Sequence, residues 1–103
     1  MNVINRAAIR QAQKRHPNCR EWLEDWWHVA RRSHWANLQD VRKLYPSADE
    51  VGSCLVFDAS GARRLIVGVY YSRPDLPNSG TIYIKHFLTH AEYDKDYWKK
   101  DCC

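Results

Sequence analysis

The stretch CLVFDASGARRLIVGVYY, residues 54–71, decides the fold because it contains two strands and the turn between them. CLVF (54–57) and RRLIVGVYY (63–71) are rich in β-branched and aromatic residues, which fit the pleated surface of a sheet. DASG (58–61) separates them, and Asp and Gly supply the local hydrogen bonds and permissive backbone angles of a turn. We therefore predict an antiparallel pair of strands in the middle of the chain.

Side chains alternate between the two faces of a strand, which assigns the residues of 63–71 to opposite sides. One face carries Leu65, Val67 and Val69. The other face carries Arg64, Ile66 and Tyr70. An arginine thus lies opposite the aliphatic row, on a face that can be open, and its planar fork of donors suits a phosphate group.

A third strand, TIYIKHFL (81–88), follows the loop SRPDLPNSG (72–80), whose two prolines and glycine interrupt regular structure. Alternation along this strand predicts two sets of residues. Ile82, Ile84 and Leu88 lie on one face, opposite Tyr83, Lys85 and Phe87. Three strands joined in sequence predict an antiparallel meander.

Helical patterns precede the strands. Val3 and Ile4 are compatible with a short edge strand, and Asn5 is a suitable cap for a helix over residues 6–15. Pro17 disfavours helical geometry at the residue before it, so this helix ends there. Asn18, with a glutamate three residues later, has the spacing of a capping box for the next helix.

The second helix is predicted to run to about residue 32, with apolar residues at helical intervals. These are Trp22, Leu23, Trp26, Trp27 and Ala30. The row indicates a core-facing side more simply than a platform for stacking bases, although the latter also uses aromatic residues. Asn37 and Asp40 repeat the capping pattern before a third, short helix that ends at Pro46.

These elements predict one domain over residues 1–103 of the α+β class. We expect a small antiparallel sheet of three to four strands, with the N-terminal helices packed on one face and a C-terminal helix.

Composition indicates the cellular compartment, the state of the thiols and the kinds of partner that the charge allows. No residue run has the length and apolarity of a membrane span or of a signal peptide, so we expect a cytoplasmic protein. The four cysteines, Cys19, Cys54, Cys102 and Cys103, form no CxxC pair, which predicts reduced thiols. The net charge of +4 permits nucleic-acid binding without demanding it.

The third strand leads directly into a concentration of titratable groups. Thr89 and Glu92 form a capping box, which places His90 in the first turn of a helix. Tyr93 and Asp94 follow three and four residues later, on the same helical face as His90. Unpaired N–H groups at a helix start attract anions, and a histidine beside a bound phosphate can act as acid or base near neutral pH. A plain helix start with a packed tyrosine explains the same pattern without chemistry.

A metal site is not indicated. His16 and Cys19 have the spacing of a zinc-ligand pair, but no second pair matches them. We therefore expect neither a metal nor any other cofactor.

Three ordered segments resemble the HigB family of type II toxin–antitoxin toxins, within the RelE-like superfamily of mRNA-cleaving enzymes. HWANLQDVRKLYPSADEVGS (34–53) resembles the family's tryptophan-containing segment and its P-S-A-D turn. VFDASGARRLIV (56–67) resembles its F-N-x-x-G-N-x-Y-R-L-I strand pair, and YIKHFLTHAEYDK (83–95) resembles its T-H-x-E-Y-D-K ending. The last segment is the most specific, and the resemblance covers nearly the whole chain.

The resemblance implies a RelE-like fold, a cognate helix-turn-helix antitoxin, and ribosome-associated cleavage of mRNA without a metal. The family's strand arginine corresponds to Arg64, and the histidine and tyrosine of its ending correspond to His90 and Tyr93. We therefore expect these three residues to be catalytic. Three further cations are expected to hold RNA phosphates. They are Arg63, Lys85 and Lys95.

The chain departs from the family pattern at one turn. Gly61, Ala62, Arg63 and Arg64 stand where the family has G-N-x-Y-R, so the turn is one residue shorter and lacks the asparagine and the tyrosine. Asp58 replaces an earlier asparagine. Two alternatives to the nuclease therefore stay open: a non-catalytic RelE-fold protein that binds a protein target such as DNA gyrase, and a plain RNA-binding module.

Overall fold

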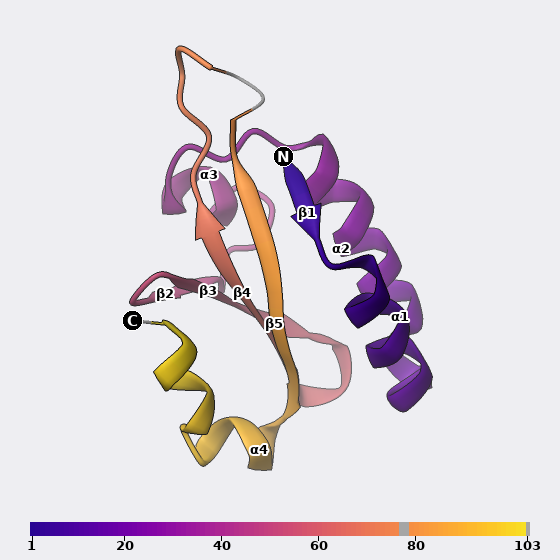
Figure 1. Ribbon diagram of the computed structural model, residues 1–103. Helices are drawn as coiled ribbons and strands as arrows, with labels where there is room; N and C mark the ends of the chain where they lie inside the picture. The colour runs from indigo at the N-terminus through magenta and orange to yellow at the C-terminus, as the bar shows by residue number, and fades with distance from the viewer. Residues whose placement is uncertain (77–78, 103) are drawn as a thin grey trace.

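The computed structural model describes residues 1–76 and 79–102. Within these residues one mixed sheet has the strand order β1-β5-β4-β3-β2 (Figure 1). Its strands are β1 (Asn2–Ile4), β2 (Asp49–Val51), β3 (Cys54–Ala59), β4 (Arg63–Tyr70) and β5 (Thr81–Thr89). The helices are α1 (Arg6–Arg15), α2 (Arg20–Arg32), α3 (Leu38–Arg42) and α4 (His90–Asp94), with 3-10 turns at Pro17–Cys19, Ser60–Ala62 and Tyr97–Cys102. Across the described ranges, no helix combines the length and apolarity needed to cross a bilayer.

The α+β class and the central meander are confirmed, because β3, β4 and β5 pair as antiparallel neighbours. The predicted count of three to four strands is wrong. β2 adds an antiparallel strand beyond β3, and β1 pairs in parallel with the start of β5, so the sheet has five strands and mixed direction. β2 is three residues long and begins with two exposed acidic residues, too short a segment for an alternating pattern to be read.

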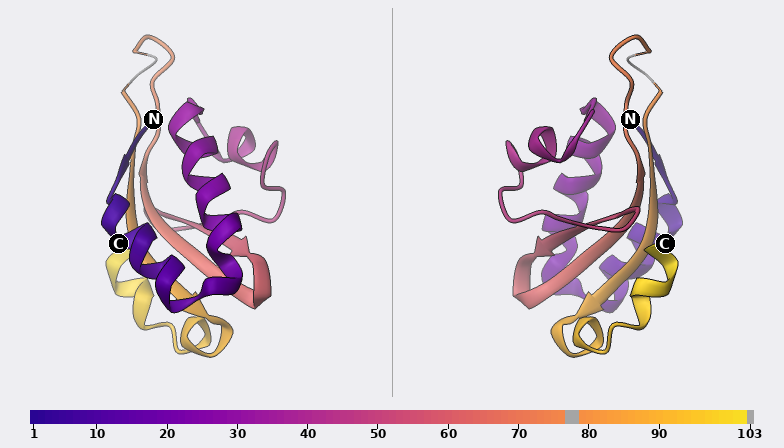
Figure 2. Two further views of the ribbon diagram at one scale, coloured as in Figure 1. Left: turned by 90° about the vertical axis from the view of Figure 1, so that its right-hand side faces the viewer. Right: turned by 90° about the vertical axis from the view of Figure 1, so that its left-hand side faces the viewer.

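Both faces of the sheet carry a cover, rather than one, but the second is covered only in part, because Tyr70 and Tyr83 on that face are exposed. The N-terminal helices pack on the first face, around large buried side chains. These include Ile9, Leu23, Trp26, Phe57, Leu65 and Val67. The opposite face is covered by residues 90–102, here called the C-terminal segment, whose Trp98 and Cys102 pack against Val56 and Ile66. Figure 2 shows α2 and the C-terminal segment on opposite sides of the sheet.

A bulge in β5 changes which residues face the helices. Ile66 pairs with His86 but Val67 pairs with Ile84, so Lys85 is the extra residue. Such an insertion shifts the alternation of all residues after it. Phe87 therefore packs with the helices, and Leu88 packs with the C-terminal segment. The predicted grouping of Leu88 with Ile82 and Ile84 is wrong for this reason.

The helix starts are mostly as predicted. The side chain of Asn5 accepts a hydrogen bond from the Ala7 N–H at 3.0 Å, and that of Asn37 accepts one from the Asp40 N–H at 2.9 Å. The predicted capping box at Asn18 is wrong. Pro17 starts a 3-10 turn that contains Asn18, and α2 begins only at Arg20, with no side-chain cap.

The end of the chain differs most from expectation. The expected C-terminal helix is only one turn, α4, and the chain then reverses at Asp96, whose φ is 62°. The 3-10 turn that follows brings Cys102 to β3, where it forms a disulfide with Cys54. The prediction of reduced thiols is therefore wrong for this pair, whose partners are 48 residues apart in sequence. Cys19 is a buried free thiol, and Cys103 lies outside the described residues.

Candidate active site

The sheet register brings the start of β4 to the end of β5. Arg63 pairs with Thr89 and Arg64 with Leu88, so the two arginines lie beside the first turn of α4. α4 begins immediately after Thr89, because this residue caps it. Residues that are about 25 positions apart in sequence therefore meet where β4 begins and β5 ends.

Arg64 and Tyr93, both predicted to be catalytic, are in contact. The guanidinium carbon of Arg64 lies 5.4 Å from the centroid of the Tyr93 ring, within cation–π range. The same side chain is about one-fifth exposed, and its Nε lies 2.9 Å from the Asp58 carboxylate on β3. The Tyr93 ring in turn stacks on Trp98 at 5.0 Å between centroids. Arg64 is thus held from two sides, and its Nη1 also donates a hydrogen bond to the Arg63 carbonyl at 3.2 Å.

His90 lies in the first turn of α4 and is well exposed, at 61% of its side chain. Its Nε2 lies 3.2 Å from the Asp94 carboxylate, four residues later. The predicted common face of His90 and Asp94 is therefore present. An exposed imidazole beside a carboxylate can exchange protons with a bound substrate without disturbing the core.

The capping box at α4 is confirmed in both directions. The Thr89 hydroxyl accepts a hydrogen bond from the Glu92 N–H at 3.2 Å, and the Glu92 carboxylate accepts one from the Thr89 N–H at 2.9 Å. This bond from the Thr89 backbone, followed by the hydroxyl contact, holds the pKa of Glu92 below its usual value. The Glu92 carboxylate thus occupies part of the helix start at which an external anion was predicted to bind.

We expect Thr89→Ala to lower the free energy of unfolding by about 1 kcal/mol, because it removes one cap of α4. Thermal melts followed by circular dichroism would measure the change, with Thr89→Ser as the control that keeps the capping oxygen. An unchanged Tm for Thr89→Ala would contradict the assigned role of the cap.

The expected phosphate-binding cations occupy three different environments. The Nε of Arg63 donates a hydrogen bond to the His16 Nδ1 at 3.1 Å. The Nζ of Lys85 donates to the Asp101 backbone carbonyl, on the face covered by the C-terminal segment. Lys95 lines a hollow of about 310 Å³ together with His86 and other residues. The structure therefore does not gather these cations around Arg64 and Tyr93.

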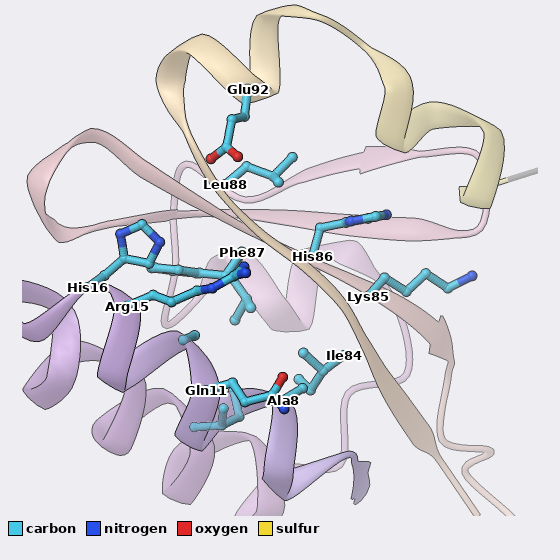
Figure 3. Close-up of a pocket in the computed structure, with 13 residues that line it drawn as sticks. Ala8, Gln11, Arg15, His16, Ile84, Lys85, His86, Phe87, Leu88 and Glu92 are labelled. Atoms are coloured by element: carbon cyan, nitrogen blue, oxygen red, sulfur yellow. The ribbon is translucent and has the colours of Figure 1, made fainter.

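A cavity of about 460 Å³ lies between α1 and β5, next to α4 (Figure 3). Arg15 and His16 project toward it from the end of α1, Phe87 lies on the strand side, and Glu92 lies above. Burial, and then the neighbouring charge of Arg63, lower the pKa of His16. This imidazole is accordingly a neutral acceptor for the Arg63 guanidinium near neutral pH.

Sequence reasoning had not assigned His16, His86 or Asp58 to a functional site. The partners of His16 and His86 are 47 and 15 residues away, and no local spacing signals either contact. Asp58 was noticed only as a departure from a pattern. Among the described residues, no group of three or more His, Cys, Asp or Glu side chains is placed so that it could hold a metal ion. Activity without a metal stays a prediction.

Comparison with known families identifies a match over most of the chain. A model of the HigB toxin family, described as the RelE-like toxic component of a toxin–antitoxin system, matches residues 19–96. This span includes every residue predicted for catalysis or phosphate binding. No curated protein matches the chain at a significant level.

Proposed function

The chain belongs to the HigB family of RelE-like toxins from toxin–antitoxin systems, and on this premise we propose that it is an endoribonuclease that cleaves mRNA on the ribosome without a metal. It acts in the cytoplasm, and a cognate helix-turn-helix antitoxin neutralises it. The proposed catalytic residues are Arg64, His90 and Tyr93. Arg63, Lys85 and Lys95 are proposed to contribute binding to RNA phosphates.

The observation that carries this proposal is the contact between Arg64 and Tyr93 at the start of α4, the helix that also presents His90. A guanidinium, a phenol and an exposed imidazole from two elements together offer charge stabilisation and proton transfer. The partly buried arginine is already oriented by Asp58 and by the aromatic ring, so little ordering is required of it when a phosphate binds.

The chemistry requires little beyond these groups, because RNA carries its own nucleophile, the 2′-hydroxyl. A base removes the 2′-hydroxyl proton, the oxygen attacks phosphorus, and an acid protonates the departing 5′-oxygen. The products are a 2′,3′-cyclic phosphate and a free 5′-hydroxyl. We propose that Arg64 stabilises the extra charge on the non-bridging oxygens, while His90 and Tyr93 orient the groups or transfer the protons.

A second candidate function is binding of a protein target, such as DNA gyrase, without catalysis. The turn Gly61–Arg64 favours it, because this turn lacks the asparagine and the tyrosine of the family pattern. Both candidates predict toxicity, and they differ in whether mRNA is cut.

We expect expression of the protein alone to arrest growth, and translated mRNA to be cut within ribosome-bound reading frames. Co-expression of the antitoxin should restore growth. In a purified translation system, sequencing of RNA 5′ ends would locate the cuts. A zinc chelator should leave these cuts unchanged, provided that the magnesium that the ribosome needs is kept in the buffer.

Normal growth with abundant soluble protein would contradict the toxin function. Arrest with intact mRNA would instead support the protein-binding function, and activity lost on chelation and restored by zinc would contradict the metal-free mechanism.

A further inference from the structure

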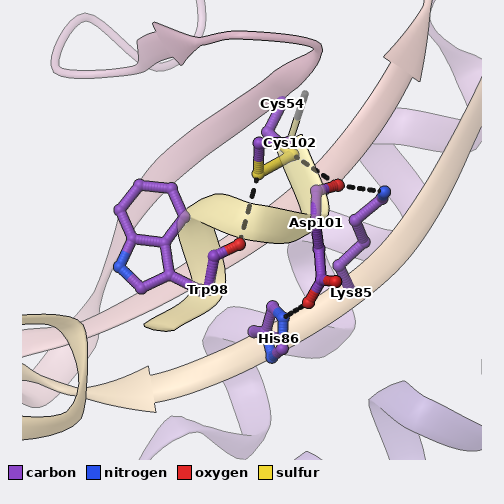
Figure 4. Close-up of a disulfide and its surroundings, with 6 residues drawn as sticks. All are labelled: Cys54, Lys85, His86, Trp98, Asp101 and Cys102. Atoms are coloured by element: carbon purple, nitrogen blue, oxygen red, sulfur yellow. Dashed lines mark hydrogen bonds and ion pairs between the residues drawn. A yellow bond between two sulfur atoms is a disulfide. The ribbon is translucent and has the colours of Figure 1, made fainter. Parts of the chain in front are cut away.

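Beyond the Arg64 site, the second face of the sheet carries two basic side chains that the chain engages through Asp101, His86 by its carboxylate and Lys85 by its backbone carbonyl. Lys85 and His86 are consecutive on β5, and the bulge at Lys85 directs both toward the C-terminal segment. The His86 Nε2 lies 2.8 Å from the Asp101 carboxylate, and the Lys85 ammonium donates to the Asp101 backbone carbonyl (Figure 4). One acidic residue thus engages two basic residues.

The geometry around Lys85 is specific. A Cβ at Gly68, on the adjacent strand, would lie 2.8 Å from the Lys85 Cε, so the glycine leaves the space in which the lysine side chain runs. His86 is about one-third exposed, and the hollow beside it is lined by two further cations, Lys95 and Lys100, and by one carboxylate, that of Glu92, which accepts the capping hydrogen bond of α4. Basic groups that converge in this way favour a phosphate as well as a carboxylate.

Asp101 is ionised and held in place. The hydrogen bond from His86 keeps the pKa of the Asp101 carboxyl below its usual value. The next residue, Cys102, is joined to Cys54 by the disulfide, and its carbonyl accepts a hydrogen bond from the Ser53 N–H at 2.8 Å. A side chain at Gly52 would collide with this carbonyl, which shows how closely the end of the chain fits against the β2–β3 turn.

Apart from the peptide bond that joins it to β5, the disulfide is the only covalent link between the described C-terminal segment and the strands it covers. Without it, the carboxylate of Asp101 would be held by exposed ion-pair contacts, which are weak and are screened by salt. The buried Trp98 would still anchor the middle of the segment. Opening the disulfide therefore leaves the last residues held only by non-covalent contacts, among them the hydrogen bond from the Ser53 N–H to the Cys102 carbonyl, without requiring the fold to change.

We propose that Lys85 and His86 form a subsite for a phosphate of RNA, and that Asp101 occupies this subsite while the Cys54–Cys102 disulfide is closed. The identity of the anion as RNA rests on the proposed function. In the opening step, two thiols of a reductant such as dithiothreitol are oxidised to a disulfide, and the Cys54–Cys102 bond is reduced to two thiols. The freed Asp101 is then displaced by a phosphate, and the affinity for RNA rises.

The test measures binding separately from cleavage. The probe is a fluorescent 2′-O-methyl RNA oligonucleotide, which lacks the nucleophile and cannot be cut, and its anisotropy is followed with oxidised and reduced protein. We expect reduction to tighten binding about tenfold, within the usual range of coupling between two linked events. The slope of log Kd against log salt should steepen by about 0.7, the increment for one more phosphate contact on a single strand.

Two variants of equal charge change isolate the subsite. Asp101→Asn in oxidised protein should tighten binding as reduction does, because it removes the competing carboxylate. Asp96→Asn is the matched control, since Asp96 pairs with Lys99 within the same segment. This control should leave binding close to that of the parent protein, apart from a small nonspecific charge effect.

The thiol variants complete the test. The double substitution Cys54→Ser with Cys102→Ser should bind RNA tightly without reductant, and Lys85→Ala should abolish the gain on reduction. The proposal would be overturned if reduction left both the affinity for RNA and the slope of log Kd against log salt unchanged, once titration had confirmed the new thiols. The C-terminal segment would then be only a structural cover of the sheet. If the double variant fails to fold, Asp101→Asn decides alone. A redox response without any cleavage of ordinary mRNA would retain the subsite and reject the nuclease.

Discussion

Replacing His90 by alanine is expected to lower the rate of mRNA cleavage by about 10² to 10⁴ fold, the usual contribution of one proton-transfer group. The variant should remain folded, because His90 is exposed and its ion pair with Asp94 is of a kind that contributes only about 0–1 kcal/mol. The cap made by Thr89 and Glu92 is untouched, so α4 still begins at the same place. Single-turnover cleavage on programmed ribosomes would measure the rate.

Two matched variants separate chemistry from structure. Asp94→Asn weakens the ion pair but keeps the imidazole, and its effect should be much smaller. Tyr93→Phe keeps the ring that stacks on Trp98 and contacts Arg64 but removes the hydroxyl, so any large loss of rate reports on that hydroxyl. If His90→Ala and Tyr93→Phe melt early yet cleave normally when folded, this cluster is a helix start with a packed tyrosine.

The second large effect concerns Arg64. We expect Arg64→Ala to reduce the cleavage rate by about 10² to 10³ fold, the typical result of removing a group that stabilises developing charge. Antitoxin binding should change far less, because the proposed partner of this guanidinium is the scissile phosphate. Both quantities can be measured on the same preparation, by cleavage on ribosomes and by titration calorimetry with the antitoxin.

The conservative change sharpens this result. Arg64→Lys keeps the positive charge but loses the planar fork that donates to Asp58 and, in the proposed mechanism, to the phosphate. Its cleavage rate should therefore lie closer to that of Arg64→Ala than to that of the parent protein. Full activity in Arg64→Ala would show that the arginine only packs between Asp58 and Tyr93. The protein-binding function would then be favoured if growth were still arrested.

Local signals in the sequence were sufficient for much of the architecture. Asn5, Asn37 and Thr89 were recognised as helix caps because a cap depends on residues two or three positions away. The three central strands were recognised because their composition and turns are also local. The juxtaposition of Arg64 with the start of α4 followed from the family resemblance, and the register of β4 and β5 explains it physically.

Features that depend on distant partners were decided only by the tertiary structure. The bulge at Lys85 reverses the faces of Phe87 and Leu88, because a register shift arises from pairing with β4 and leaves no mark in the alternation of β5 itself. The parallel pairing of β1 has the same origin, since two edge residues do not specify the direction of a neighbour. The disulfide was missed because spacing cannot predict that the chain reverses at Asp96 and returns to β3.

The sequence by itself therefore determined the class of the domain, the starts of α1, α3 and α4, its central strands and its family. The tertiary structure alone decided that Arg64 is held between Asp58 and Tyr93, that Arg63 is bound to His16, and that the C-terminal segment covers part of the second face of the sheet. The physical reason is the range of the interactions. Caps, turns and alternation act within a few residues, whereas ion pairs, stacking and cross-links join side chains that only folding brings together.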